Sequence, residues 1–108
     1  MEPAIRERSS LLFGALSHET RLRIIEILVD GGKTVTQIQQ SLGITQSGTS
    51  QHLAILARSG VLAVEQQGTS RIYRLRGPRI PRILDLIEEF CQVHQLYGSD
   101  GGLEDLTP

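Results

Sequence analysis

The sequence lacks the features that mark membrane, secreted and disulfide-bonded proteins. No run of 18 apolar residues occurs, so no membrane-spanning helix is expected, and the N-terminus has no signal-peptide pattern. Its one cysteine, Cys91, cannot form a disulfide within the chain, which fits a reducing cytoplasm. A chain of 108 residues is expected to fold as one domain with a modest core. We therefore predict a small cytoplasmic protein.

The sequence also lacks the residue groups of common catalytic sites. It has no Ser-His-Asp arrangement, no glycine-rich phosphate-binding loop and no evident pair of acids lining a pocket. The glycines stand instead where the chain is expected to turn. We predict that the protein is not an enzyme and that it needs no cofactor.

Net charge is low, but the charges are segregated along the chain. The total is −1, which by itself argues against a nucleic-acid binder. Residues 31–82, however, carry seven basic side chains and one acid, whereas residues 83–108 carry six acids and no lysine or arginine. The positive charge therefore lies in the middle of the chain, which favours nucleic-acid binding there.

A short amphipathic helix is predicted near residue 36. Its apolar positions recur at helical spacing, at Val35, Ile38 and Leu42. Thr36 and Gln39 are spaced as a capping box at its start, and Gly43 is suited to end it because glycine enters positive φ without a Cβ clash. Thr45 can then cap a second helix from Gln46 to about Arg58. Helix, tight turn and helix together predict a helix-turn-helix.

The second helix has two chemically different faces. Its apolar side consists of Thr49, Leu53, Leu56 and Ala57. Its polar side consists of Gln46, Ser47, Ser50, Gln51 and Arg58. Short hydroxyl and amide side chains both donate and accept hydrogen bonds, as reading of base edges in the major groove requires. The alternative is an ordinary solvated face. His52 falls on the apolar flank, where a contact to the wing or to a DNA phosphate is expected. The residues of this helix and its cap that are expected to contact DNA are Thr45, Gln46, Ser47, Ser50, Gln51, His52 and Arg58.

Two helices are predicted before this motif. The first covers residues 4–16, and the second covers about 18–30 and ends at Gly31-Gly32. Ser17 is expected to cap the second helix, and His18 to be an exposed residue of its first turn. The second helix is expected to pack through Leu22, Ile25, Leu28 and Val29. Residues 33–35 are predicted to be extended and to add a short third strand.

A β-hairpin is predicted after the motif. Two β-prone runs, 61–65 and 71–75, flank the polar loop 66–70, which contains Gly68. The hairpin residues expected to contact DNA phosphate or the minor groove are Gln67, Thr69, Ser70 and Arg71. The alternative is a solvated hairpin end. The predicted fold class is mainly α with a small β-hairpin wing, in the order α-α-α-α-β-β-α, which is a winged helix-turn-helix.

The last predicted helix, about 80–97, is unusually apolar. It carries one stripe at Ile80, Leu84, Ile87, Cys91 and His94, and a second at Ile83, Ile87, Phe90 and Tyr97. So broad an apolar face exceeds what a small core covers, so we expect the same helix of a second subunit to cover it, joined by residues 4–16. The expected dimer contacts are Leu12, Ile83, Ile87, Phe90, Cys91 and His94. Residues 1–97 would form the domain, and 98–108 a disordered acidic tail.

The chain resembles the ArsR/SmtB-type bacterial repressors. The resemblance is carried by ALSHETRLRIIEIL (Ala15–Leu28), LGITQSGTSQHLAIL (Leu42–Leu56), GVL (Gly60–Leu62) and IYRL (Ile72–Leu75), and spans about residues 12–97. It implies a homodimer bound to a near-palindromic double-stranded DNA operator and released by an inducer. It also implies that Gln46, Ser47, Ser50 and Gln51 face bases or phosphates. The alternative from another class is an adaptor whose winged helix binds protein.

The inducer is unknown, because the known sensing sites of this family are incomplete here. Thr34 and Thr36 stand where one group of metal sensors has cysteines, and thiolates cannot be replaced by hydroxyls for soft metals. Cys91 resembles the second cysteine of the sulfur-sensing subgroup, but the first falls on Glu26. Cys91 is therefore a candidate sensing residue without a partner thiol in the subunit. Glu88, Cys91 and His94 could hold a metal ion across a dimer, although a cysteine packed between two subunits is the simpler interpretation.

Overall fold

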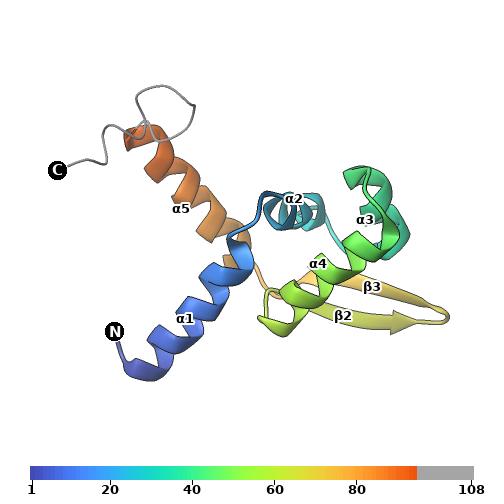
Figure 1. Cartoon of the computed structure of the whole chain (residues 1–108), viewed down its shortest axis with the longest axis horizontal. Coiled ribbons are helices and arrows are strands. Elements are labelled where there is room, and N and C mark those ends of the chain that lie inside the picture. Colours follow the sequence, from blue (N-terminus) through green and yellow to red (C-terminus); the bar gives the residue numbers. More distant parts are fainter. Residues whose placement is uncertain (95–108) are drawn as a thin grey trace. The chain divides into compact units, whose positions relative to one another are not determined.

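A computed structural model describes residues 1–94 and divides the chain into two compact units, Met1–Gly77 and a second that begins at Pro78. The first unit holds α1 (Pro3–Leu16), α2 (Glu19–Leu28), β1 (Lys33–Thr34), α3 (Val35–Leu42), α4 (Gln46–Arg58), β2 (Leu62–Gln67) and β3 (Ser70–Leu75) (Figure 1). The second unit holds α5 (Arg79–His94). The predicted class and element order are confirmed. None of the helices in residues 1–94 is both long and apolar enough to cross a membrane.

The core of the first unit lies between α2, α3, α4 and the start of the hairpin. Its fully buried side chains are Ile24, Ile25, Leu28, Ile38, Thr49, Leu53, Leu56 and Val61. Thr49 is tolerated there because its hydroxyl donates to the carbonyl of Thr45 at 2.9 Å. The predicted apolar side of the second motif helix is thus confirmed for Thr49, Leu53 and Leu56. In α2, the prediction was partly wrong: Ile24 is buried, Leu22 is half-buried and Val29 is exposed.

The turn between α3 and α4 is set by two threonine caps and one glycine. Gly43 ends α3 at φ 70°, and the Thr45 hydroxyl accepts from the amide of Gly48 at 3.0 Å to begin α4. The capping box at the start of α3 was predicted two residues too late. It is formed by Thr34 and Gln37: the Thr34 hydroxyl accepts from the Gln37 amide at 3.2 Å, and the Gln37 side chain accepts from the Thr34 amide at 2.9 Å.

The junction of α1 and α2 also differs from the sequence expectation. Ser17 does not cap α2; its hydroxyl donates to the carbonyl of Gly14 at 2.7 Å and so closes α1. His18 is the N-cap of α2 instead, because its Nδ1 accepts from the amide of Thr20 at 3.1 Å. His18 is exposed, as predicted, but it is a capping residue and not a bystander in the first turn.

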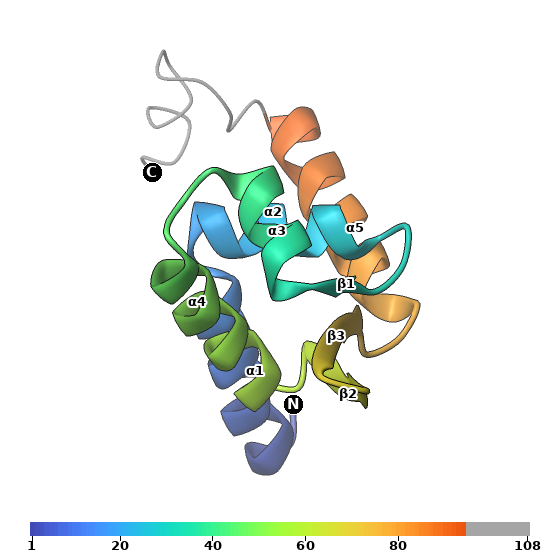
Figure 2. The ribbon, with the colours of Figure 1, turned by 90° about the vertical axis from the view of Figure 1, so that its right-hand side faces the viewer.

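The three strands form one antiparallel sheet in the order β1-β3-β2 (Figure 2). The hairpin runs in register from Leu62 opposite Leu75 to Gln67 opposite Ser70, and β1 pairs Thr34 with Ile72. The short third strand is confirmed, although Val35 belongs to α3. The predicted loop of residues 66–70 was too long, because the strands continue to Gln67 and resume at Ser70, leaving a tight turn with Gly68 at φ 60°.

In the second unit, α5 has no buried residue. Its exposed large apolar side chains are Leu86, Ile87, Phe90 and Val93, while Ile80, Ile83, Leu84 and Cys91 are partly exposed. The start of the helix agrees with prediction, with Pro81 in its first turn, where a missing N–H costs no hydrogen bond. Tyr97 and the predicted acidic tail, 98–108, lie outside the described residues.

Candidate nucleic-acid interface

The N-terminal half of α4 presents a polar surface built from four side chains. We call Gln46, Ser47, Ser50 and Gln51 the reading face; all four are exposed. None of these side chains forms a hydrogen bond with another residue of the stretch 1–94. Immediately behind them, Thr49 and Leu53 are fully buried. The helix is therefore held in place by its apolar side, and within residues 1–94 the hydrogen-bonding groups of its polar side have no partner.

Gly48 lies among these residues for a reason of packing. A Cβ at this position would lie 2.9 Å from the Thr45 hydroxyl and 3.8 Å from Cδ1 of Ile44. The first distance is too short for a methyl group beside an oxygen that accepts a hydrogen bond from the same residue. Glycine lowers intrinsic helix stability by roughly 1 kcal/mol relative to alanine, but here it preserves the cap that begins the helix.

Three further residues were predicted to contact DNA, and each is placed differently from the reading face: Thr45, His52 and Arg58. The Thr45 hydroxyl is engaged in the cap, and Arg58 is exposed but lies twelve residues after Gln46, about 18 Å farther along the helix axis. His52 contacts α2, not the wing: its Nδ1 is 3.4 Å from Nη1 of Arg21, and its ring centroid is 4.6 Å from that of His18. These contacts take the place of the expected contact between His52 and the wing, and the expected contact with a DNA phosphate stays a prediction.

The surroundings of His52 disfavour its charged form. Partial burial lowers the pKa of the imidazole, and the neighbouring His18 and then Arg21 lower it further by charge repulsion. A lowered pKa means that His52 is neutral over more of the pH range than a solvated histidine, so it can accept a hydrogen bond from a cationic neighbour.

The wing ends in a polar tip. Gln67, Thr69, Ser70 and Arg71 are all exposed, as expected of residues that contact DNA. Farther down the hairpin, Nε of Arg74 donates to a carboxylate oxygen of Glu65 at 3.1 Å, and this bond lowers the pKa of Glu65. Arg71 has no ion pair within residues 1–94, so its charge is available to a phosphate.

Two further cationic side chains approach one another at the end of α4 and were not singled out from the sequence. A Cβ on Gly60 would lie 3.9 Å from a guanidinium nitrogen of Arg8 and 3.9 Å from one of Arg76. Gly60 itself has φ 85°, where glycine is favoured. Arg8 and Arg76 are 68 positions apart in the chain, so no local pattern signals their proximity.

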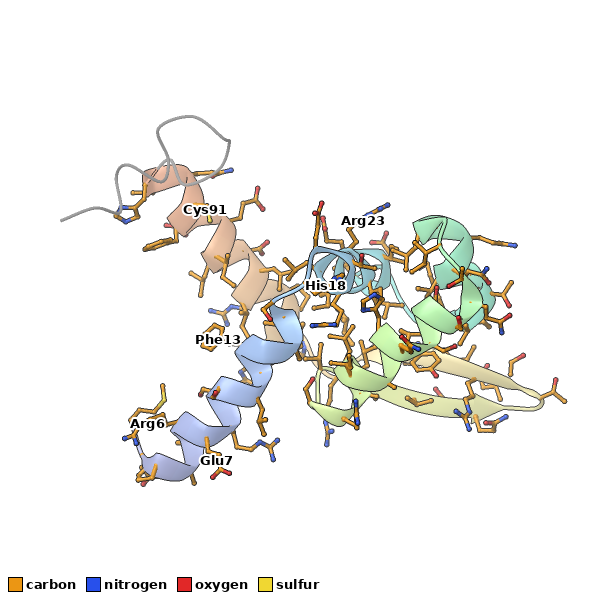
Figure 3. All side chains as sticks on the ribbon, in the orientation of Figure 1. Arg6, Glu7, Phe13, His18, Arg23 and Cys91 are labelled. Carbon is orange, nitrogen blue, oxygen red and sulfur yellow. The ribbon has the colours of Figure 1, made fainter. Side chains whose placement is uncertain are left out.

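The possible metal set on α5 does not gather within one chain. In the part of the chain that the structure describes, no three His, Cys, Asp or Glu side chains are placed to hold an ion. A carboxylate oxygen of Glu88 accepts from Gln92 at 3.3 Å, and the ring of His94 lies 4.4 Å from that of Phe90. Cys91 is partly exposed, and Figure 3 labels it on α5.

Comparison with known proteins identifies relatives among helix-turn-helix transcriptional regulators. Residues 16–65 match a helix-turn-helix domain family. Over 92 residues the chain is 33% identical to the biofilm growth-associated repressor of Xylella fastidiosa, covering 84% of this chain and 80% of the repressor. Over 73 residues it is 37% identical to Rv0081, an uncharacterised HTH-type transcriptional regulator of Mycobacterium tuberculosis; that alignment covers 67% of this chain but only 64% of the length of Rv0081.

Two solved structures share the fold. The crystal structure of M. tuberculosis Rv0081 matches with a TM-score of 0.74 and 30% identity, over 85% of this chain and 92% of that one. The solution structure of a homodimeric winged helix-turn-helix DNA-binding domain from Mycobacterium bovis, Mb0332, matches with a TM-score of 0.77 and 25% identity, over 84% of each chain. That domain is described as a possible ArsR-family transcriptional regulator.

Three features of the first unit define a winged helix-turn-helix domain. They are a helix pair joined by a glycine turn, an exposed polar face on the second helix, and an antiparallel wing that follows it. The chain belongs to the ArsR/SmtB-type family of winged helix-turn-helix transcriptional regulators. The resemblance seen in the sequence is thereby confirmed.

Proposed function

We propose that this protein is a transcriptional repressor that binds a near-palindromic double-stranded DNA operator as a homodimer. The observation that carries the proposal is the division of α4 into a fully buried side, with Thr49, Leu53 and Leu56, and an exposed reading face. Because chromosomal operators lie in the cytoplasm, the proposal also locates the protein there.

The chemistry of the reading face suits base recognition better than it suits solubility. Glutamine can form paired hydrogen bonds with adenine, and serine can contact several base edges. The cap at Thr45 fixes the first turn of α4, where a recognition helix makes most of its base contacts. Arg71 at the wing tip supplies sequence-independent attraction to phosphate.

The exposed apolar surface of α5 supports the homodimer. Ile87, Phe90 and Val93 expose large side chains to water, and contiguous apolar surface of this kind marks an interaction site. Leu12 of α1 is partly exposed and is expected to join this interface. A two-fold dimer would place its two reading faces about 34–36 Å apart, one turn of B-DNA.

The proposal is tested by fluorescence anisotropy with the DNA upstream of the protein's own coding region, compared with a scrambled duplex of equal length. Preference for the upstream DNA, and a linear fall of log affinity with log salt concentration, is the expected result. Equal binding to both duplexes would contradict sequence-specific recognition. Absence of DNA binding at low salt would favour the alternative, an adaptor that binds protein.

A further inference from the structure

One side chain links α1, α2 and α4 in the first unit. Nε of Arg21, on α2, donates to the carbonyl of Ala15 at 2.6 Å, and Nη2 reaches the carbonyl of Gly14 at 3.5 Å. Both carbonyls belong to the last turn of α1, and the Gly14 carbonyl also accepts from the amide of Ser17 at 3.3 Å and from its hydroxyl at 2.7 Å. Nη1 of the same guanidinium lies 3.4 Å from Nδ1 of His52 on α4. Arg21, on α2, therefore contacts both α1 and α4.

The hydrogen bonds define the protonation of the two neighbouring histidines. Arginine has no acceptor, so Nδ1 of His52 must be unprotonated to accept from Arg21. Nδ1 of His18 accepts from the Thr20 amide and must be unprotonated as well. The two imidazole rings are 4.6 Å apart at the start of α2, where Figure 3 shows His18. The contact of Arg21 with His52 thus requires an Nδ1 on His52 that can accept a hydrogen bond.

The charged and titratable groups that act on His52 are His18, the N-cap of α2, and Arg21 of α2, and both lower its pKa by charge repulsion. Protonation of His52 would remove the acceptor for Arg21 and add a second positive charge beside the guanidinium.

The linked helices have different tasks under the proposed function. His52 directly follows Gln51 of the reading face, so a shift of His52 moves that face. α1 is the helix expected to join α5 in the dimer interface, and Phe13 projects from it on the side away from the helix-turn-helix (Figure 3). The guanidinium of Arg21 thus connects a dimer helix to the recognition helix.

We infer that Arg21 is a positioning residue that fixes α4 against α1 and thereby sets the separation of the two reading faces in the dimer. It acts through His52 and does not itself contact DNA. This inference rests on the proposed function and specifies it further: Arg21 determines which spacing between operator half-sites is accepted. It also makes that spacing preference sensitive to acid, because Arg21 acts through the imidazole of His52.

The experiment compares Arg21→Lys and Arg21→Gln with the matched variants Arg23→Lys and Arg23→Gln. Arg23 is exposed on the same helix and projects away from α4 (Figure 3). Lysine keeps the charge but cannot direct three donors in a plane at two helices. Affinities are measured for the operator, for operators with one base pair added or removed between half-sites, and for a single half-site, with circular dichroism as the check of folding.

We expect Arg21→Lys to bind a single half-site as the unmodified protein does. Its affinity for the correctly spaced operator should fall about tenfold, the effect of one lost charge-assisted hydrogen bond, and the three spacings should become nearly equivalent. The Arg23 variants should retain the original preference. Unchanged spacing preference in a folded Arg21→Lys protein would overturn the inference. Failure of the unmodified protein to distinguish operator from scrambled DNA would instead contradict the proposed function.

A pH series separates positioning from a merely structural role. The folded protein holds the pKa of His52 below its ordinary value, so neutral His52 is present above about pH 6.5 and is lost as pH falls through the lowered pKa. Spacing preference of the unmodified protein should decline over that range. In His52→Asn, asparagine keeps an acceptor near the position of Nδ1 but does not titrate. This variant should keep its preference in acid; an equal decline would refute the role of His52.

Discussion

Helices α4 and α5 make opposite use of their apolar residues. Eight of the 16 residues of α5 are apolar, yet none is buried, and Phe90 is 55% exposed. In α4 five of 13 residues are apolar, and Leu53 and Leu56 are completely inaccessible to solvent. The more apolar helix is thus the less buried one. The difference indicates that the apolar side of α4 is buried by its own chain, whereas the apolar surface of α5 is suited to contact with another molecule.

The largest effect is expected from truncation of the buried side of α4. Leu53→Ala should lower the free energy of unfolding by about 2–5 kcal/mol, because it leaves a cavity in a core that cannot fully collapse. Total stability of a small domain is about 5–15 kcal/mol, so the loss should be evident in urea denaturation. The midpoint should shift equally at low and high protein concentration.

The matched truncation on α5 is Ile87→Ala. For this variant the midpoint of urea denaturation should depend on protein concentration more strongly than it does for the unmodified protein, since the lost contact lies between subunits. A shift that is as large as that of Leu53→Ala and independent of concentration would mean that Ile87 packs within its own chain, and the contrast between the two helices would fail.

A charge at position 87, in the apolar surface of α5, should break the dimer directly. Ile87→Glu would bring two like charges into an apolar interface, where the lost solvation is not repaid by a partner. Sedimentation should show monomer, or the protein should become insoluble. Gln92→Glu adds the same charge on the same helix at an exposed position outside both stripes, and it should remain dimeric. A stable dimer of Ile87→Glu would remove α5 from the interface.

The exposed side of α4 should respond in DNA binding and not in folding. Gln51→Ala should cost about 1–3 kcal/mol on the operator and little on random DNA, with unchanged stability. Arg71→Ala should weaken both complexes alike and reduce the salt slope by about one for each subunit. These affinities are measured across a salt series. Parallel losses on both DNAs for Gln51→Ala would mean that this residue contacts only backbone.

The smallest effect on binding is expected at Cys91. Cys91→Ser should keep operator affinity within about twofold, because the substitution changes one partly exposed atom outside the reading face. Under the hypothesis that Cys91 senses oxidants, polysulfide or peroxide releases the unmodified protein from DNA but not the serine variant. Mass spectrometry would confirm that the thiol reacted. Full operator binding by protein modified at Cys91 would end that hypothesis.

The elements whose limits depend on local chemistry were predictable from sequence. α4 begins after the Thr45 cap and ends at Arg58, as the pattern of caps and apolar positions predicts. The start of α3 was not predictable in the same way, because Thr34-Gln37 and Thr36-Gln39 have the same capping-box spacing. Pairing of Thr34 with Ile72 decides between them, and a contact between residues so distant in the chain leaves no local signal.

Part of the candidate site also could not be predicted from local sequence patterns. The reading face follows from helical spacing alone, and all four of its residues are exposed as predicted. The partners of His52 do not follow from spacing, because Arg21 lies 31 positions earlier and reaches His52 only after α2 has packed on α4. Which of two adjacent polar residues caps α2 was also undetermined, since the Ser17 hydroxyl is taken by α1.

The central position of β3 gives the wing two levels of protection against local opening. Near Ile72 and Tyr73 the sheet has three strands, and Thr34, which pairs there, is also the cap of α3. Beyond these pairs, from Arg71 to Gly68, the hairpin is a ribbon of only two strands. Amide hydrogens at the base should therefore exchange with solvent only when α3 also unfolds, whereas those at the tip should exchange in small, independent openings. The wing tip can then adapt to a DNA backbone without loosening the helix pair beside it.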